Sequence, residues 1–305
     1  MLSLKEVGYT GIVAPRSTIL PGTTERVVTP HFEHVEYNPE FLAEGRAFKD
    51  FYRPDKVVLG FGDTRTLEVL RGVYSNIDAP KLEMSLRAAE LVKYANNAFL
   101  AMKIAYANEI GNIAKNIGVD VYQIMDAVGL DRRIGREFLN AGIGFGGSCF
   151  PKDVSALAHF ARTLGYEPLI LEAVLKQNER QPLQLVKLLK NKVGSLRGVK
   201  VSVLGLAFKP ETDDVREAPS IKIVRALLEG GAEVHAYDPR AGENFRRFDP
   251  KFTQVVYHKS ARECVEAGEV VLILTEWEEF KNPSLYTGKT VLEGRRILGR
   301  EGVCW

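Results

Sequence analysis

The chain has 305 residues, of which 45% are hydrophobic and 26% charged, so it is long enough for two or three globular domains. Its net charge of +2, from 41 basic and 39 acidic residues, provides no overall field that would recruit nucleic acid or an acidic membrane. No apolar run reaches the roughly 18 residues of a membrane span. The first residues, Met1–Glu6, lack the architecture of a signal peptide.

The cysteines and histidines form no metal-binding pattern. Cys149, Cys264 and Cys304 have neither metal-ligand spacing nor the even number of a disulfide framework, and the five histidines are scattered. We therefore expect no metal site and a reducing compartment, the cytoplasm.

Residues 1–81 contain strand candidates separated by helical segments. Gly11–Ala14 and Lys56–Gly60 are apolar runs typical of strands, and Thr24–Phe32 is typical of a helix. This alternation indicates a parallel α/β arrangement, but no G-x-G-x-x-G occurs before residue 82. The sequence therefore predicts the C-terminal part, a remnant, of a Rossmann-like dinucleotide-binding domain.

Residues 82–195 are predicted to form a central helical domain. Apolar residues recur at spacings of three and four from Glu83 to Ile117, no proline interrupts them, and Gly118 ends the pattern. A helix of this length, near 50 Å, usually bridges domains or packs against a partner subunit. Further helices are expected at 121–128, 154–163 and 169–193.

Residues 196–305 alternate strands and helices again. Strands are expected at 199–204, 233–238, 254–257, 270–274 and 290–292, and helices at 220–229 and 261–267. This rhythm predicts a doubly wound parallel sheet whose ligand binds at the carboxyl ends of the strands.

The run from Gly142 to Asp153 combines four glycines with a thiol, a lysine and a carboxylate. The glycines permit backbone to approach a ligand closely. A helix starting here would gather Cys149, Lys152 and Asp153 at its amino end, which favours a thiolate. The competing interpretation is a Gly-rich loop with a buried structural cysteine.

Two other pairs have a spacing of four residues. Glu40 and Glu44 would share a face if their segment were helical, where they suit acid/base work; a solvated helix start is the alternative. Lys93 and Asn97 lie within the long apolar helix and suit hydrogen bonding to an oxyanion; a snorkelling surface lysine is the alternative.

Charged and hydroxyl-bearing turns follow two strands. Phe208-Lys209-Pro210 and Asp213–Arg216 come after the first strand of the last domain, where cations suit phosphates, although an ordinary charged turn has the same composition. Ser17-Thr18 and Pro21–Thr23 offer hydroxyls and N–H groups to a cofactor, or form an ordinary turn.

In this order the motifs resemble the UDP-glucose/GDP-mannose dehydrogenase family over nearly the whole chain. The most specific segments are Asn38–Gly45, Gly144–Asp153, Gly205–Glu217 and Thr275–Trp277. Phe150 and the Thr-Glu-Trp segment look more like the UDP-glucose branch than the branches for GDP-mannose or N-acetylmannosamine.

The resemblance implies NAD-dependent oxidation of UDP-glucose to UDP-glucuronate in two steps through a cysteine thiohemiacetal and thioester. It implies catalytic roles for Cys149, Asp153, Lys93, Asn97 and Glu40. It implies substrate binding by Phe41, Leu42, Lys93, Asn97, Arg133, Phe138, Leu139, Phe145, Gly146, Phe208, Lys209 and Arg295. It implies cofactor binding by Thr18, Glu44, Lys152 and Arg216. It also implies a homodimer through helix 83–117, with Arg133 reaching the other subunit's substrate.

One departure from the family pattern is the absence of the amino-terminal Gly-rich turn that would carry the pyrophosphate. It predicts that the chain lacks most of the NAD-binding domain and turns over little by itself. Two alternatives stay open: a non-catalytic nucleotide-sugar-binding fragment without a cofactor domain, and a dehydrogenase for GDP-mannose or a UDP-N-acetylhexosamine.

Overall fold

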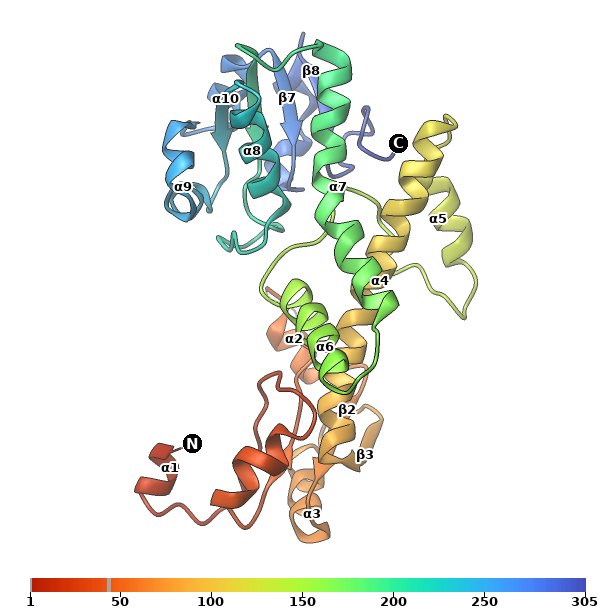
Figure 1. Cartoon of the computed structure of the whole chain (residues 1–305), viewed down its shortest axis with the longest axis vertical. Coiled ribbons are helices and arrows are strands. Elements are labelled where there is room, and N and C mark those ends of the chain that lie inside the picture. The colour runs from red at the N-terminus through yellow and green to blue at the C-terminus, as the bar shows by residue number, and fades with distance from the viewer. Residues whose placement is uncertain (1, 43–44) are drawn as a thin grey trace. The chain divides into compact units, whose positions relative to one another are not determined.

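The computed structural model describes residues 2–42 and 45–305, which form two compact units whose elements are labelled in Figure 1. Unit 1 comprises Met1–Ala98 and Ala156–Glu167, and unit 2 comprises Phe99–Ser155 and Pro168–Trp305. Two helices, α4 (Leu86–Asn116) and α6 (Phe150–Thr163), contribute residues to both units.

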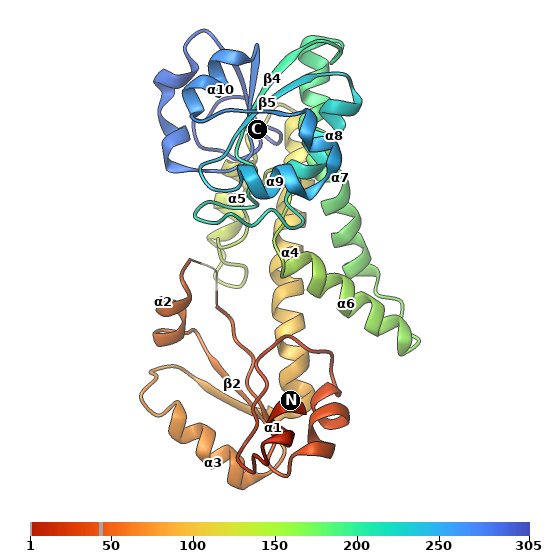
Figure 2. The same cartoon turned by 90° about the vertical axis from the view of Figure 1, so that its left-hand side faces the viewer.

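Unit 1 contains a three-stranded sheet of order β1-β2-β3. β1 (Glu36–Tyr37) runs antiparallel to β2 (Val57–Phe61), and β3 (Lys81–Ser85) runs parallel to β2. The crossover helix α3 (Thr64–Val73) lies beside β2 (Figure 2). Its Leu67 and Leu70 are buried in one core with Val57 and Leu59 of β2. The remaining elements of this unit are α1 (Leu2–Glu6), the π-helical η1 (Thr24–Val28), the 3₁₀-helical η2 (Thr29–His31) and α2 (Ala47–Tyr52).

Strand β3 corrects the predicted start of the long helix. Residues 83–85 belong to the strand, so α4 begins at Leu86 rather than at Glu83. The strand's side chains are exposed or half-buried, and its backbone pairs with β2 along the whole strand. The predicted helix 24–32 is two short helices, whereas the strand predicted at 56–60 is confirmed as β2.

The long helix is otherwise confirmed over 31 residues. It ends two residues before Gly118, which has a φ of 73° that glycine adopts without steric cost. Residues up to Ala98 belong to unit 1 and those from Phe99 to unit 2, in keeping with the prediction that so long a helix bridges domains.

Unit 2 contains a five-stranded parallel sheet of order β6-β5-β4-β7-β8. The order reverses beside β4, so the switch point lies where β4 and β7 end. The strands are β4 (Lys200–Leu204), β5 (Glu233–Tyr237), β6 (Val256–Tyr257), β7 (Val270–Ile273) and β8 (Thr290–Glu293). The helices are α5 (Val121–Gly129), α7 (Leu169–Val193), α8 (Pro219–Glu229), α9 (Gly242–Phe248), α10 (Ala261–Ala267) and the 3₁₀ turns η3 (Pro250–Gln254), η4 (Glu278–Lys281) and η5 (Pro283–Tyr286).

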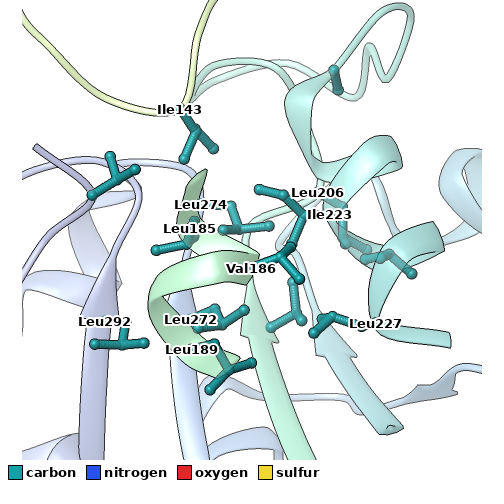
Figure 3. Packing of buried hydrophobic residues seen from close by; sticks show 14 of the residues in the cluster. Ile143, Leu185, Val186, Leu189, Leu206, Ile223, Leu227, Leu272, Leu274 and Leu292 are labelled. Atoms are coloured by element: carbon teal, nitrogen blue, oxygen red, sulfur yellow. The ribbon is translucent and has the colours of Figure 1, made fainter. Parts of the chain in front are cut away.

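Both faces of this sheet are buried, as a doubly wound fold requires. On one face, Leu185 and Leu189 of α7 pack near Leu272 and Leu292, and Ile223 and Leu227 of α8 belong to the same core (Figure 3). On the other face, Cys264 and its neighbours in α10 pack on alternate strand residues. Ile143, from the predicted cysteine loop, joins the first core and thereby ties that loop to the sheet (Figure 3).

The predicted doubly wound sheet is confirmed strand by strand, with ends that differ by one or two residues. The predicted helix at 154–163 begins four residues earlier, at Phe150, and α9 and the 3₁₀ turns have no counterpart in the prediction. No helix in the described part of the chain is both long and apolar enough to cross a membrane.

Candidate functional site

The loops after β4, β7 and β8 meet at the switch point of unit 2. The Thr275 hydroxyl after β7 donates a 2.7 Å hydrogen bond to the carbonyl of Ala207 after β4. Gly205 has a φ of 93°, and a Cβ there would lie 2.5 Å from Thr275, so only glycine fits. Arg295 after β8 lies 3.9 Å from the Glu276 carboxylate. Phe208, Lys209 and Arg295 are therefore carried by loops of one strand edge.

Asp238, at the end of β5, holds these loops together. Its Oδ2 accepts hydrogen bonds from the Leu206 and Ala207 N–H groups and from the Trp277 indole, and its Oδ1 from the Arg240 and Ala241 N–H groups. In a dinucleotide-binding sheet an acid at this position binds the ribose. Here the carboxylate is buried and its bonds go to the protein itself.

The glycine-rich segment is hydrogen-bonded to the same strand edge. The Ile143 N–H donates 3.1 Å to the Gly294 carbonyl, and the Arg295 guanidinium donates to the Gly144 carbonyl. The Gly147 N–H donates 2.9 Å to the Arg216 carbonyl. A Cβ on Gly147 would lie 2.8 Å from the Phe208 ring, so the aromatic side chain rests on bare backbone.

Cys149 caps the amino end of α6. Its carbonyl accepts a 2.8 Å hydrogen bond from the Asp153 N–H, and its thiol is exposed, whereas Cys264 and Cys304 are buried. The Lys152 ammonium lies 2.6 Å from the buried Asp153 carboxylate. The helix thus gathers thiol, lysine and carboxylate at its amino end, where the helix dipole stabilises negative charge. The alternative of a buried structural cysteine is wrong.

Three phenylalanines surround this helix start. The Phe150 ring lies 5.9 Å from the Phe145 ring in an edge-to-face contact and 6.1 Å from the Phe138 ring. Phe145 and Leu139 are buried, and Phe138 has a positive φ of 64° that places it in the left-handed region. These predicted substrate residues lie together in unit 2 with Gly146 and Cys149.

Lys93 and Asn97 are both buried in unit 1, 4% and 5% exposed. The Lys93 ammonium donates 2.6 Å to the Glu40 carbonyl and lies 3.2 Å from the Glu40 carboxylate. It also lies 5.2 Å from the Phe41 ring, which Lys56 approaches to 4.5 Å. The alternative of a snorkelling surface lysine is wrong.

Glu40 does not lie on a helix, so the predicted shared helical face with Glu44 is not formed at Glu40. Residues 38–42 belong to no helix or strand, and the Glu40 carboxylate accepts a 2.6 Å hydrogen bond from the Leu42 N–H. Pro39 disfavours helical backbone at the residue before it, Asn38. Glu44 lies outside the described residues.

Three predicted residues lie away from these clusters or contact them only through backbone. Thr18 is half-buried in unit 1, next to Ser17, whose carbonyl accepts a hydrogen bond from Tyr37. Arg133 is exposed and pairs with Asp131 at 2.6 Å. Arg216 contacts the cysteine loop through its carbonyl, while its side chain pairs with Asp214 at 2.7 Å.

The sequence interpretation missed a set of amide side chains, Asn108, Asn178 and Gln181, that bind the backbone of the glycine-rich segment. Their only sequence signal is the spacing of three between Asn178 and Gln181 on a predicted helix, which is common. Within residues 2–42 and 45–305 no group of three or more metal-binding side chains is arranged to hold a metal ion.

Three family models match the chain. The NAD-binding domain of the UDP-glucose/GDP-mannose dehydrogenase family matches residues 4–78, its central domain 87–180, and its UDP-binding domain 202–300. A UDP-glucose 6-dehydrogenase of Haloferax volcanii is 41% identical over 95% of this chain and 71% of its own length. The chain belongs to this family.

Other relatives agree with this membership. A UDP-glucose 6-dehydrogenase of Bacillus subtilis is 44% identical over 87% of this chain and 58% of its own length. A solved UDP-glucose dehydrogenase from Pyrobaculum islandicum superposes with a TM-score of 0.93 at 46% identity, covering 99% of this chain and 72% of that one. A UDP-D-ManNAc dehydrogenase from Pyrococcus horikoshii gives 0.84 at 27% identity, covering 99% and 75%.

The chain is therefore an NAD-dependent dehydrogenase, and NAD is its cofactor. The prediction that it lacks most of the NAD-binding domain is not supported, because that domain's model matches residues 4–78. The absence of a G-x-G-x-x-G motif led to this prediction, because the motif describes a single turn. The family model instead matches the sequence of residues 4–78 as a whole.

The described residues of unit 1 fit this cofactor only in part. The amino end of α3 is occupied by its own cap, since the Asp63 carboxylate accepts a hydrogen bond from the Thr66 N–H and this bond lowers the Asp63 pKa. A carboxylate at that position excludes a pyrophosphate from α3. The half-buried Thr18 is a residue of unit 1 whose hydroxyl could donate a hydrogen bond to the cofactor.

Proposed function

We propose that the protein oxidises the C6 primary alcohol of UDP-glucose to a carboxylate, forming UDP-glucuronate. The observation that carries this proposal is the exposed Cys149 thiol at the amino end of α6, on a segment hydrogen-bonded to the switch point of the unit 2 sheet. A nucleophile beside a nucleotide-binding strand edge suits covalent capture of a sugar aldehyde.

The switch point holds the nucleotide sugar in this proposal. Lys209 and Arg295 supply positive charge for the diphosphate. The residues of unit 2 that surround the nucleotide in this proposal are Phe138, Leu139, Phe145, Gly146 and Phe208. Phe41 and Leu42 contribute from unit 1, and Arg133 contributes to the substrate of a second subunit.

The thiolate of Cys149 adds to the C6 aldehyde, and the new C–S bond converts the carbonyl into a thiohemiacetal. Bound NAD supplies the acceptor for the hydride lost from C6 in each of the two oxidations. Loss of the second hydride leaves a thioester, and water then breaks the C–S bond, returning the thiol and releasing the carboxylic acid. The covalent bond keeps the aldehyde from leaving between the two oxidations.

The other catalytic groups act on protons and oxyanions. Lys93 and Asn97 donate to the alkoxide and tetrahedral oxyanions, and the burial of both side chains supports this role because a hydrogen bond to an anion is stronger away from water. Asp153 moves a proton through water, and Glu40 orients the hydrolytic water. Thr18, Glu44, Lys152 and Arg216 serve the cofactor.

NADH formation during full conversion of a limiting amount of UDP-glucose tests the reaction. Two NADH per sugar are expected, and a ratio of one would reject the thioester route. Cys149→Ser is expected to abolish glucuronate formation, with Ser148→Ala as the control at the neighbouring position. A substrate preference for GDP-mannose or a UDP-N-acetylhexosamine over UDP-glucose would reject the substrate assignment. Binding of UDP-glucose without NADH formation would favour the non-catalytic alternative.

We further place this enzyme in the cytoplasm as a homodimer. The free state of all three cysteines supports a reducing compartment. Exposed apolar side chains on α4 in unit 2 form a stripe at intervals of seven residues, which supports association with a second copy. This α4 stripe consists of Phe99, Tyr106 and Ile113.

A further inference from the structure

The backbone that leads to the cysteine is bound by side chains of two helices in unit 2. The Gly142 N–H donates 2.7 Å to the Asn108 amide oxygen of α4. The Gly142 carbonyl accepts a 2.8 Å hydrogen bond from the Gln181 amide of α7. Asn178, one turn earlier on α7, binds Phe145. Polar groups that a loop usually turns toward water are here bonded to protein.

The Asn178 amide binds both backbone groups of Phe145. The Phe145 N–H donates 2.8 Å to the Asn178 Oδ1, and the Asn178 Nδ2 donates 2.9 Å to the Phe145 carbonyl. One side chain thus makes the pair of bonds that an adjacent β-strand would make. The fit is close, because a Cβ on Gly144 would lie 2.7 Å from the same Oδ1.

Phe145 is linked to the thiol by packing as well as by sequence. Its ring contacts Phe150, the first residue of α6, which follows Cys149 directly. Asn178 itself stands on a 25-residue helix that buries Leu185 and Leu189 in the core of the sheet. The amide therefore connects a firmly packed helix to the segment that determines where the thiol lies.

We propose that Asn178 is a positioning residue for the Cys149 thiol, holding the glycine-rich segment in register with the sheet. This inference rests on the proposed function of Cys149 as the nucleophile. Loss of the clamp would leave Lys209 and Arg295 on the loops after β4 and β8. The main effect is therefore expected on the chemical step, with a smaller effect on nucleotide binding through Phe145.

Asn178→Ala and Asn178→Asp, with Asn191→Ala as control, test this role. Asn191 lies on the exposed side of the same helix. Asn178→Ala is expected to lower kcat about 10- to 100-fold, the range for a misplacement near 1 Å, and to change KM less than about threefold. Asn191→Ala is expected to match the wild type. An unchanged kcat for Asn178→Ala, or an equal loss in the control, would overturn the inference.

Asn178→Asp provides a pH signature that a purely structural role lacks. The introduced carboxylate keeps an acceptor for the Phe145 N–H but places a second anionic oxygen against the Phe145 carbonyl. Protonation restores a donor, so the kcat of this variant relative to wild type is expected to rise as the pH falls toward about 4 to 5. The relative kcat of Asn178→Ala should stay constant, and parallel profiles for the two variants would contradict the clamp.

Amide hydrogen exchange separates this inference from the proposed function, because it needs no turnover. The Phe145 N–H is expected to exchange at least about tenfold faster in Asn178→Ala, since it loses its acceptor, and at the wild-type rate in Asn191→Ala. Absence of NADH formation by the wild type would reject the proposed function only. Unchanged Phe145 exchange would reject the clamp even in an active enzyme.

Discussion

At the residue scale, Glu36 of β1 is a buried carboxyl. It is 0% exposed, the Thr66 hydroxyl donates to its Oε1, and its Oε2 has no hydrogen-bond partner among the described residues. Burial, and after it the charge of Asp63, raises its pKa from 4.5 to about 8. The carboxyl is therefore protonated in the folded protein at neutral pH and ionised in the unfolded chain.

This pKa shift predicts the sign of a pH effect on stability. A raised folded-state pKa gives stability that is complete below 4.5 and is lost as the pH rises through about 8. Glu36→Gln removes the titration, so its free energy of unfolding relative to wild type is expected to increase by more than about 1 kcal/mol across this window. Urea denaturation at several pH values measures it, with the exposed Glu33→Gln as control. Wild type and Glu36→Gln curves that run parallel with pH would disprove the assignment.

Several site residues were predictable because residues of complementary chemistry lie close to one another in the sequence. The glycines, Cys149 and Asp153 are contiguous, and Lys93 and Asn97 share a face of a long predicted helix. The shared helical face considered for Glu40 and Glu44 required a helical segment, and a spacing of four residues does not by itself show that the segment is helical. Asn178 escaped prediction because its partner is backbone 33 residues away, and hydrogen bonds to backbone leave no pattern in side-chain identity.

At the scale of elements, the conformation and packing of the glycine-rich segment depend on positions that carry no side chain. Gly147 has a φ of 82° and lies against the Phe208 ring. Gly147→Ala is expected to lose about 1 to 2 kcal/mol of stability from the left-handed backbone. It should also lower kcat/KM about tenfold or more, because the Phe208 ring must move.

Gly288→Ala is the matched control for this prediction. Gly288 has a φ of 73° with open space around its Cβ position, so it carries the backbone strain without the contact. Thermal denaturation and steady-state kinetics of both variants measure the two effects. Equal kinetics for Gly147→Ala and Gly288→Ala would show that contact with Phe208 is unimportant.

Most elements of unit 2 were predictable because parallel strands buried on both faces form short continuous apolar runs. Val270–Ile273 is such a run, and all four residues are buried. β3 was not predictable in the same way, since the alternation of Leu82 and Met84 with polar residues is short and leads directly into the apolar pattern of α4, and its pairing to β2 is a contact distant in sequence. α9 escaped prediction because it buries only Phe245 and its sequence therefore shows no apolar periodicity.

At the scale of the whole molecule, the α4 stripe predicts self-association. Phe99 and Ile113 are 57% and 53% exposed, which is unfavourable for a helix that stays in water. The protein is expected to behave as a dimer in light scattering, and Phe99→Glu combined with Ile113→Glu to shift it to monomer. Val256→Glu, at an exposed apolar position of β6, should leave the mass unchanged. A monomeric wild type would remove the basis for this interface.

The division into ranges 1–81, 82–195 and 196–305 stays a prediction at this scale. Tertiary contacts group the chain into two units, because α4 and α6 each carry residues of both. Composition and periodicity mark where the type of secondary structure changes, but they contain no information on which helix packs with which sheet. That information resides in long-range contacts, which a single sequence does not display.

The hydrogen bonds to Asp238 limit which ligands the sheet of unit 2 can bind. Its carboxylate already accepts hydrogen bonds from four backbone N–H groups and an indole. An adenosine ribose that bound at this position would have to break these hydrogen bonds. The sheet therefore has the strand order of a dinucleotide-binding sheet, but the Asp238 hydrogen bonds disfavour a dinucleotide at the usual position. We therefore expect that NAD does not compete with the proposed nucleotide sugar for this sheet.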